Sequence, residues 1–157
     1  MFEDQDRSTW DWSIIRRGMS WMTRSLHGTQ ASRYHIESAI AWEHCRAASL
    51  EQTDWQRIAE LYRQLIHFIR TPAIQISHAY AQSQFMEADQ VLAKLENDTP
   101  KQLSDTERAQ FDTLRAYLNR RASRVDQAAV LFDAALERDI SASHKQAIQK
   151  LREKFEV

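Results

Sequence analysis

Histidine and cysteine are the residue types in this sequence that could do metal or nucleophilic chemistry. The chain has six histidines and one cysteine, and four possible metal ligands fall in one segment: His35, Glu43, His44 and Cys45. Zinc ligands on a helix stand at positions i and i+4, or in paired CxxC-type clusters. His35 and His44 would lie about two and a half turns apart, on opposite faces, and the three consecutive residues would fan out. We therefore expect no metal site and no cofactor.

Nucleophilic catalysis has no better support in the sequence. Neither a GxSxG sequence nor a glycine-rich loop is present, so nothing would expose a serine at a strand-to-helix turn. Cys45 is expected within a helix, on a small-residue face, where cysteines are typically structural. Carboxylates are frequent but no pattern marks a cleft. We expect a non-enzymatic protein, and an enzyme acting through the histidines is a remote alternative.

Composition bounds the class of protein. Only 2 glycines and 2 prolines occur in 157 residues, which excludes most β-sandwiches, Rossmann folds and P-loops. The net charge of −1 is not that of a nucleic-acid-binding domain. No apolar run is long enough to cross a bilayer, no signal peptide is evident, and a lone cysteine suits a reducing compartment. We expect one cytoplasmic domain over residues 1–157, with no direct contact to nucleic acid or membrane.

Apolar residues recur at steps of three and four almost throughout, which predicts about eight helices, short connections and no strand. Ser8 is expected to cap the first helix, with Asp11 completing a capping box, and Gly28 to end it. The second helix should run from about Ser32 to Ala48, and Thr53 or Asp54 should cap the third. The fourth helix should begin at Pro72, and the fifth should include residues 88–95. The sixth should begin after Ser104, and the seventh and eighth should include residues 128–136 and 148–155.

Two predictions concern which helix faces are buried. The second helix should pack through small residues and one tyrosine at helical spacing: Tyr34, Ser38, Ala41, Cys45 and Ala48. Among the tryptophans, Trp12 and Trp55 fall on apolar stripes and are expected in the core. Trp10 and Trp21 lie to one side and should face solvent or a partner.

A degenerate repeat indicates how the helices are stacked. A pattern of apolar residues at relative positions one, five and eight occurs three times, starting at Ile58, Ala88 and Ala128. The spacing between these starts differs, so the repeat has no constant length. The preceding helix carries Phe111, Leu114 and Leu118 in the complementary order. This spacing favours antiparallel pairs resembling tetratricopeptide (TPR) repeats, stacked in a right-handed α–α superhelix. A non-repetitive helical bundle is the alternative.

Specific stretches of sequence resemble a known family. The segments that carry the resemblance are residues 3–11 (EDQDRSTWD), 14–18 (IIRRG), 34–45 (YHIESAIAWEHC) and 53–65 (TDWQRIAELYRQL). They occur in the same order in the long C-terminal TPR-like extension of some extracytoplasmic-function (ECF) RNA polymerase sigma factors. The chain departs from that pattern at Ser77-His78, where the family has Asn-Arg, and in residues 118–124, which lack the family's glycine.

The resemblance implies a function in control of transcription initiation. In such sigma factors the extension is thought to govern activity in place of a separate anti-sigma protein. The polymerase-binding and promoter-reading regions two and four have no counterpart in this chain. The partner implied is therefore a protein: the N-terminal regions of the sigma factor, RNA polymerase, or a regulator. A free-standing TPR-like adaptor that binds a peptide or protein is the alternative.

Two groups of residues are candidates for partner binding. If the second, fourth and sixth helices line a concave face, five polar residues would point into it: His78, Gln82, Asp112, Asn119 and Arg120. The second group is the charged N-terminal stretch with its tryptophan: Glu3, Asp4, Gln5, Asp6, Arg7 and Trp10. An exposed charged loop is poor core material and so suits a contact. The equally weighted alternative is that this stretch caps and docks the first helix.

Overall fold

The computed structural model describes residues 6–25, 32–98 and 102–155, and this part of the chain contains helices and no strand. A short 3₁₀ turn, η2 (Arg7–Thr9), precedes eight α-helices. They are α1 (Trp12–Ser25), α2 (Arg33–Arg46), α3 (Trp55–Phe68), α4 (Pro72–Ser83), α5 (Ala88–Asn97), α6 (Asp105–Arg121), α7 (Val125–Leu136) and α8 (Ala142–Glu153). The predicted all-α class and the eight predicted helices are confirmed.

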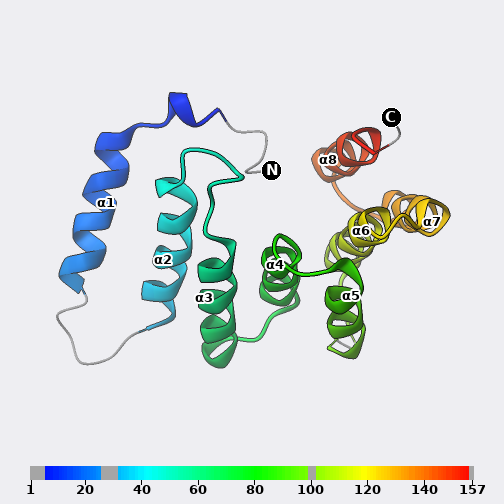
Figure 1. The fold of residues 1–157 in the computed structure, drawn as a ribbon, viewed down its shortest axis with the longest axis horizontal. Coiled ribbons are helices and arrows are strands. Elements are labelled where there is room, and N and C mark those ends of the chain that lie inside the picture. The colour runs from blue at the N-terminus through cyan, green and yellow to red at the C-terminus, as the bar shows by residue number, and fades with distance from the viewer. Residues whose placement is uncertain (1–5, 26–31, 99–101, 156–157) are drawn as a thin grey trace.

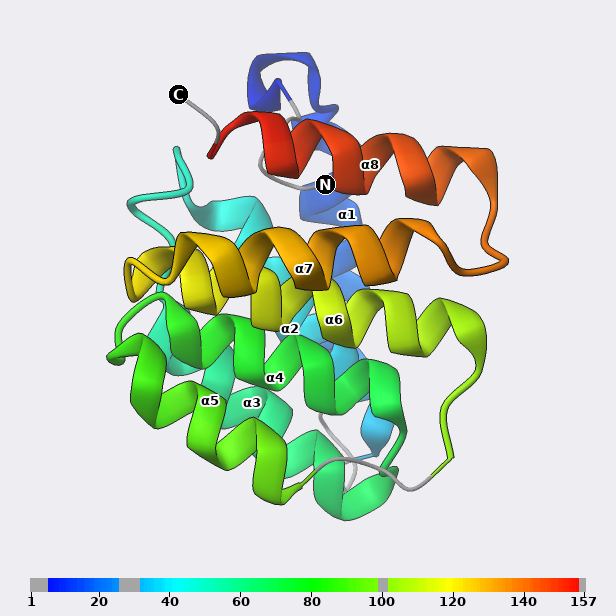
Figure 2. The same ribbon diagram turned by 90° about the vertical axis from the view of Figure 1, so that its right-hand side faces the viewer.

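Each helix packs on the next one along the chain. Contacts join α1 to α2 and so on through α7 to α8, and α4 also contacts α6. Short connections, such as residues 122–124 between α6 and α7, turn the chain back so that neighbours run in opposite directions. In Figure 1 the helices follow an arc from α1 at one side to α7 at the other, with α8 beside α6 and α7. Figure 2 shows α4 to α8 as a series of nearly parallel rods.

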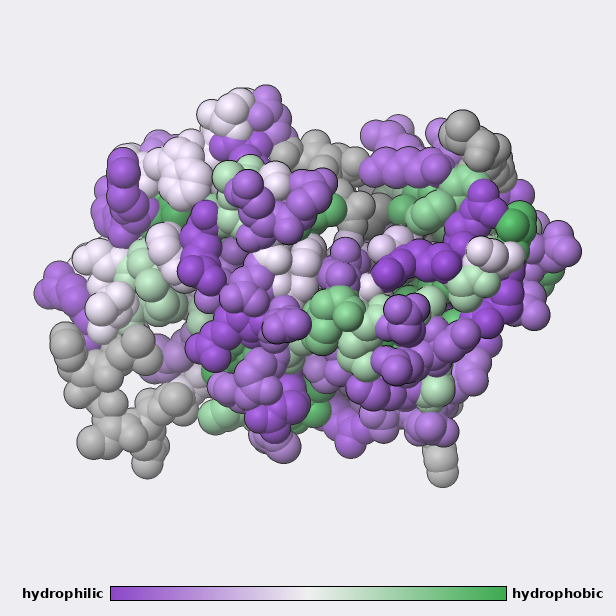
Figure 3. Space-filling view, viewed as in Figure 1, coloured by the Kyte–Doolittle hydropathy of each residue, from purple (hydrophilic) through white to green (hydrophobic). Residues whose placement is uncertain are grey.

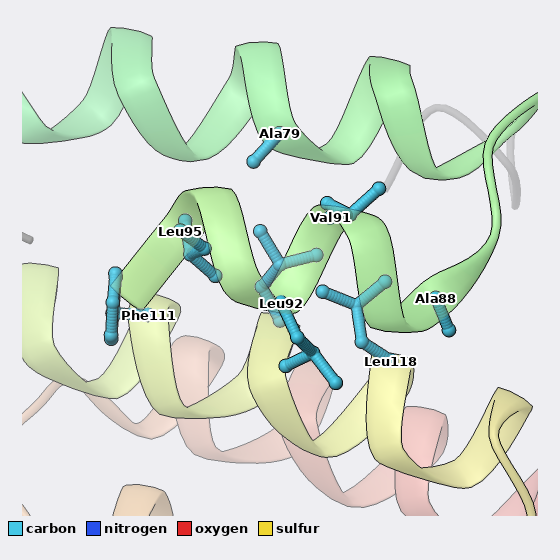
Figure 4. Packing of buried hydrophobic residues seen from close by; sticks show 8 residues of the cluster. Ala79, Ala88, Val91, Leu92, Leu95, Phe111 and Leu118 are labelled. Carbon is cyan, nitrogen blue, oxygen red and sulfur yellow. The ribbon is translucent and has the colours of Figure 1, made fainter. Parts of the chain in front are cut away.

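Three buried apolar clusters hold this series together, and α4 and α6 each take part in two of them. One cluster joins α2, α3 and α4 around Ile58 and Leu65. The second joins α4, α5 and α6 around Val91 and Leu118, and Figure 4 shows its side chains interlocking between these helices. The third joins α6, α7 and α8 around Phe132. The residues of the degenerate repeat therefore form the core, with Tyr62 half-buried.

Local signals place several helix starts where the sequence predicts them. Thr71 caps α4, and Pro72 occupies the first turn, where a missing N–H costs nothing. Ser104 and Glu107 form the reciprocal capping box of α6: the Ser104 N–H donates to the Glu107 carboxylate at 2.9 Å, and the Glu107 N–H to the Ser104 hydroxyl at 3.3 Å. Asp54, rather than Thr53, caps α3 by accepting the Arg57 N–H at 2.9 Å.

The predicted start of the first helix is wrong. Asp11 caps α1, because its carboxylate accepts the N–H groups of Ser13 at 2.8 Å and Ile14 at 3.2 Å. Ser8 belongs instead to η2, which Asp6 caps. A carboxylate directly before the first turn satisfies the free N–H groups and suits the helix dipole. Gly28, the predicted end, lies outside the described residues.

The predicted buried face of the second helix is also wrong. Its buried residues are Ile36, Ile40 and His44, whereas Tyr34 and Ala41 are exposed. Isoleucine side chains remove far more apolar surface from water than alanine or serine side chains do. The i, i+4, i+8 row of large residues therefore sets the face of α2, in place of the row of small ones.

The turn between α6 and α7 has a strained backbone. Ser123 has a φ of 62°, the one positive φ found at a non-glycine residue in the described part of the chain. This conformation lets the Ala122 N–H donate to the Leu118 carbonyl at 3.0 Å and the Arg124 N–H to the Asn119 carbonyl at 2.9 Å. A left-handed residue at a helix C-terminus is normally glycine, because a Cβ clashes there.

Ser123→Gly should therefore raise the free energy of unfolding by about 1 kcal/mol. The measurement is urea denaturation followed by far-UV circular dichroism. Ser38→Gly is the matched control, because Ser38 is exposed in the middle of α2, where glycine costs about 1 kcal/mol. Equal destabilisation by the two substitutions would show that the turn carries no strain.

Candidate functional site

The N-terminal candidates act mainly within the chain. Asp6 accepts the Ser8 N–H at 2.9 Å. Arg7 donates to the Ala47 carbonyl and, at 3.3 Å, to the Ser49 carbonyl, which ties η2 to the connection between α2 and α3. The Arg7 guanidinium also lies over the Trp10 ring, 5.5 Å from its centroid. Glu3, Asp4 and Gln5 lie outside the described residues. Asp6 thus caps η2 and Arg7 anchors it, whereas the alternative expected for this stretch was to cap and dock the first helix, which Asp11 caps.

His78 and Gln82 do not line the groove described below. His78 is half-buried on α4, close to charged side chains of α3 and α5. Burial lowers its pKa, and the charges of Lys94 and Arg63 add to that effect. Gln82 is half-buried, and its carbonyl accepts the N–H groups that close the turn after α4. The groove on this helix is lined instead by Ser77, Tyr80 and their neighbours.

The three candidates on α6 make structural contacts. Asp112 is buried and accepts from Arg138 at 2.9 Å. Asn119 is buried; its amide donates to the Arg115 carbonyl at 2.9 Å and accepts from Arg124 at 2.7 Å. Arg120 donates to the Phe155 carbonyl near the end of α8. The five polar candidates from the fourth and sixth helices are therefore not brought together in one site.

A groove of about 620 Å³ is lined by five helices: α2, α3, α4, α6 and α8. The second, fourth and sixth helices, which we expected to line a concave face, do line this groove, but with different side chains from those expected. On α6 these include Thr106, Gln110, Thr113 and Tyr117 in place of Asp112. A shift of one residue turns a side chain by about 100° around a helix, which is enough to exchange the groove for the core.

Aromatic rings in contact with one another, most of them edge-on, cross the groove from helix to helix. The centroids of His44 and Trp55 are 5.5 Å apart, those of Trp55 and Tyr80 5.7 Å, and those of Tyr80 and Tyr117 6.0 Å. The row continues from Tyr117 to Phe155 at 5.8 Å, next to the end of α8. Edge contacts of this kind stabilise by about 1 kcal/mol each. We call this row, His44 to Phe155, the aromatic row.

Charge is scarce along the groove. Glu37 is the one carboxylate among the described lining residues, and neither lysine nor arginine lines it. Burial lowers the pKa of His44, and the nearby Arg7 guanidinium adds to this effect, so both favour the neutral imidazole. Burial raises the pKa of the Tyr62 phenol, which also hydrogen-bonds to Ser77. Apart from Glu37 and His144, the groove therefore presents aromatic and aliphatic surface with neutral hydrogen-bonding groups.

The lowered pKa of His44 predicts that stability falls in mild acid. As the pH drops below about 6.5, the unfolded chain takes up a proton at this position more readily than the folded chain does. The urea midpoint should therefore fall between about pH 7 and pH 5.5, and His44→Phe should weaken that dependence. His67→Gln, at an exposed position, is the control. An unchanged pH dependence in His44→Phe would contradict the assignment.

A second candidate surface lies on α1, which buries none of its residues. One row, Ile15, Met19 and Met22, is half-buried where α1 packs on α2. A neighbouring row at positions i, i+4 and i+7 consists of Ile14, Gly18 and Trp21. Ile14 is 57% exposed and Trp21 62%, and a side chain built at Gly18 would meet nothing within 4 Å. We call this row the α1 seam.

Arginines border the α1 seam. Arg17 stands between Ile14 and Trp21 in the helical net, and the Arg24 guanidinium lies 5.0 Å from the centroid of the Trp21 ring. The helix itself contains three arginines and no acidic residue. The prediction that Trp21 faces outward is confirmed. The prediction that Trp12 is a core residue is wrong, because its side chain is 38% exposed.

The described residues contain no group of three or more His, Cys, Asp or Glu side chains placed to hold a metal ion. His35 lies apart from His44, at the start of α2, where its Nδ1 accepts the Ser32 N–H at 3.0 Å. Cys45 is half-buried, and burial raises the pKa of its thiol.

Across the described ranges, no helix is both long and apolar enough to cross a membrane. On the face shown in Figure 3, most residues are hydrophilic and apolar patches lie between them.

Comparison with known proteins yields one relative and no family. No family model matches the chain, and no solved structure does. An uncharacterized protein of Rhizobium meliloti (strain 1021) is 30% identical over 143 residues, which cover 91% of this chain and 33% of the relative. The chain thus spans about a third of the length of the curated relative that it matches.

Proposed function

We propose that this chain is a non-catalytic interaction module that regulates transcription initiation, in the manner of the C-terminal domain of an ECF sigma factor. Its helices would form a TPR-like right-handed superhelix of antiparallel pairs. The sequential packing of α1 to α8 and the additional contact between α4 and α6 support that arrangement. The resemblance to such domains, which covers residues 2 to about 155 and is carried most specifically by segments within residues 3–65, supports the link to transcription.

The observation that carries the proposal is the α1 seam. Apolar side chains at i, i+4 and i+7 are the spacing by which one helix packs on another, and Gly18 allows a close approach. The bordering arginines favour a partner helix whose own flank is acidic. We assign this surface to the polymerase-binding regions of a sigma factor, whether joined to this chain or separate from it.

Co-precipitation from the source cells tests the proposal. An antibody against the chain should detect a polypeptide larger than 18.5 kDa and should co-precipitate the β subunit of RNA polymerase. In a titration of the isolated chain against the N-terminal regions of the sigma factor, Trp21→Glu should weaken binding about tenfold or more, because a tryptophan at the centre of an interface carries much of the binding energy. Val130→Glu is the control, since Val130 is 67% exposed on α7.

The alternative, a free-standing TPR-like adaptor, predicts a different result. The antibody would then detect a species of 18.5 kDa that leaves RNA polymerase behind. Equal affinity of the two glutamate variants for the sigma-factor regions would exclude the α1 seam as the docking surface. Turnover or tight metal binding that is lost on mutation of His35 or His44 would revive an enzymatic function.

A further inference from the structure

We propose that the groove between α2, α3, α4, α6 and α8 binds a small, uncharged, largely apolar aromatic molecule. This site is separate from the α1 seam, because no residue of α1 lines the groove. The inference goes beyond the proposed regulatory function and does not depend on docking through α1. It would make the module a sensor as well as a contact surface.

The first argument is the size and construction of the groove. Its volume of about 620 Å³ falls within the range of about 300–1,000 Å³ that small-molecule sites occupy. The lining comes from residues as far apart in the sequence as Glu37 and Leu151. Convergence of five helices on one cavity of this size is typical of a ligand site between packed helices.

The second argument is the chemistry of the walls. Trp55, Tyr80 and Tyr117 line the groove and fix one another through ring contacts, edge-on between Trp55 and Tyr80 and tilted between Tyr80 and Tyr117. Rings held in this way offer preformed surface for stacking on a flat aromatic ligand, which loses little entropy on binding. Gln110 and Thr113 lie on the same wall and supply neutral hydrogen-bonding groups, which can orient a ligand without pairing a charge.

The third argument is charge. A buried anion needs a cation or several donors near it, because its desolvation is costly. Neither lysine nor arginine lines the described part of the groove, and the one carboxylate there, Glu37, would repel an anion. A single exposed carboxylate, Glu37, is also too little to bind a divalent cation tightly. The lining therefore disfavours an anion, and its mostly apolar walls favour an uncharged aromatic ligand.

A matched pair of fluorescent probes tests the proposal directly. N-phenylnaphthylamine is neutral, and anilinonaphthalene sulfonate has the same ring system with an added sulfonate. We expect the purified chain to bind the neutral probe saturably at one site, and the sulfonate about tenfold more weakly or less. Fluorescence titration gives both affinities, and circular dichroism confirms that the chain is folded.

Two tryptophan substitutions locate the binding site. Gln110→Trp fills the groove from α6 and should weaken binding of the neutral probe about tenfold or more. Gln90→Trp is the control, because Gln90 is exposed on α5, which contributes no residue to the lining. If Gln110→Trp destabilises the chain, Ala73→Trp, at an exposed lining position on α4, makes the same test.

Three outcomes would overturn the proposal. They are the absence of saturable binding, affinities for the two probes that are equal, and binding that the folded Gln110→Trp and Ala73→Trp variants retain in full. If the chain binds neither probe but RNA polymerase still co-precipitates with it, the result would indicate that a protein segment covers the groove. The sensor site would then be rejected while the proposed regulatory function stood.

Discussion

Arg138→Ala is expected to lower the free energy of unfolding by about 3 kcal/mol. Asp112 is 8% exposed and its carboxylate lies 2.9 Å from the Arg138 guanidinium, while Arg115 is more distant at 3.9 Å. Loss of Arg138 removes the closest donor to this buried carboxylate and leaves Arg115 at 3.9 Å, and breaking a buried ion pair by removing one partner is strongly destabilising. Urea denaturation at neutral pH measures the loss.

The control for this prediction is Arg63→Ala. Arg63 pairs with Glu60 at 2.7 Å, but both side chains are largely exposed, so its loss should cost less than about 1 kcal/mol. The double variant Asp112→Leu with Arg138→Met removes both charges together and should recover most of the stability. Equal losses in Arg138→Ala and Arg63→Ala would mean that burial of the pair contributes nothing.

Leu118→Ala should lower the free energy of unfolding by about 3 kcal/mol as well. Leu118 is fully buried in the cluster between α4, α5 and α6, and Figure 4 shows it beside Leu92 and Val91. Truncation removes buried methyl groups and leaves a cavity that close-packed neighbours only partly fill. Urea denaturation of the variant and of the unsubstituted chain, with near-UV circular dichroism as a second probe, gives the difference in the free energy of unfolding.

Leu118→Met is the matched variant, since it conserves volume and should cost less than about 1.5 kcal/mol. A loss below about 1 kcal/mol for Leu118→Ala would show that α5 and α6 collapse into the space. It would also show that the cluster, which links the two ends of the arc, is loosely packed.

Local signals in the sequence were enough to predict the helices. The proline at position 72 and the Ser104–Glu107 pair act within one turn of backbone, so they can be recognised without knowledge of the rest of the fold. Apolar spacing likewise identified Ala128, Phe132 and Ala135 as core. Signals of this kind depend on the helix alone.

The candidate site could not be predicted in the same way, because it depends on how helices cross. His78 and Asp112 differ from the groove residues Ser77 and Thr113 by one position, and only the packing of α4 against α3 and α6 decides which pair faces inward. The aromatic row joins four helices and the end of a fifth, so no local pattern reveals it. The sequence predicted only Trp21 of the α1 seam as outward-facing. The i, i+4, i+7 spacing of the seam is also that of a buried helix face, so spacing alone does not distinguish the two.

The lack of buried residues in α1 has a consequence for hydrogen exchange. Amides of α6, which carries seven buried residues, should exchange with solvent only when the whole chain unfolds, whereas those of α1 should exchange through opening of that helix alone. The chain should therefore unfold as one cooperative body with an end that opens independently. A protein that docks on α1 would join this end to the rest and convert two opening reactions into one.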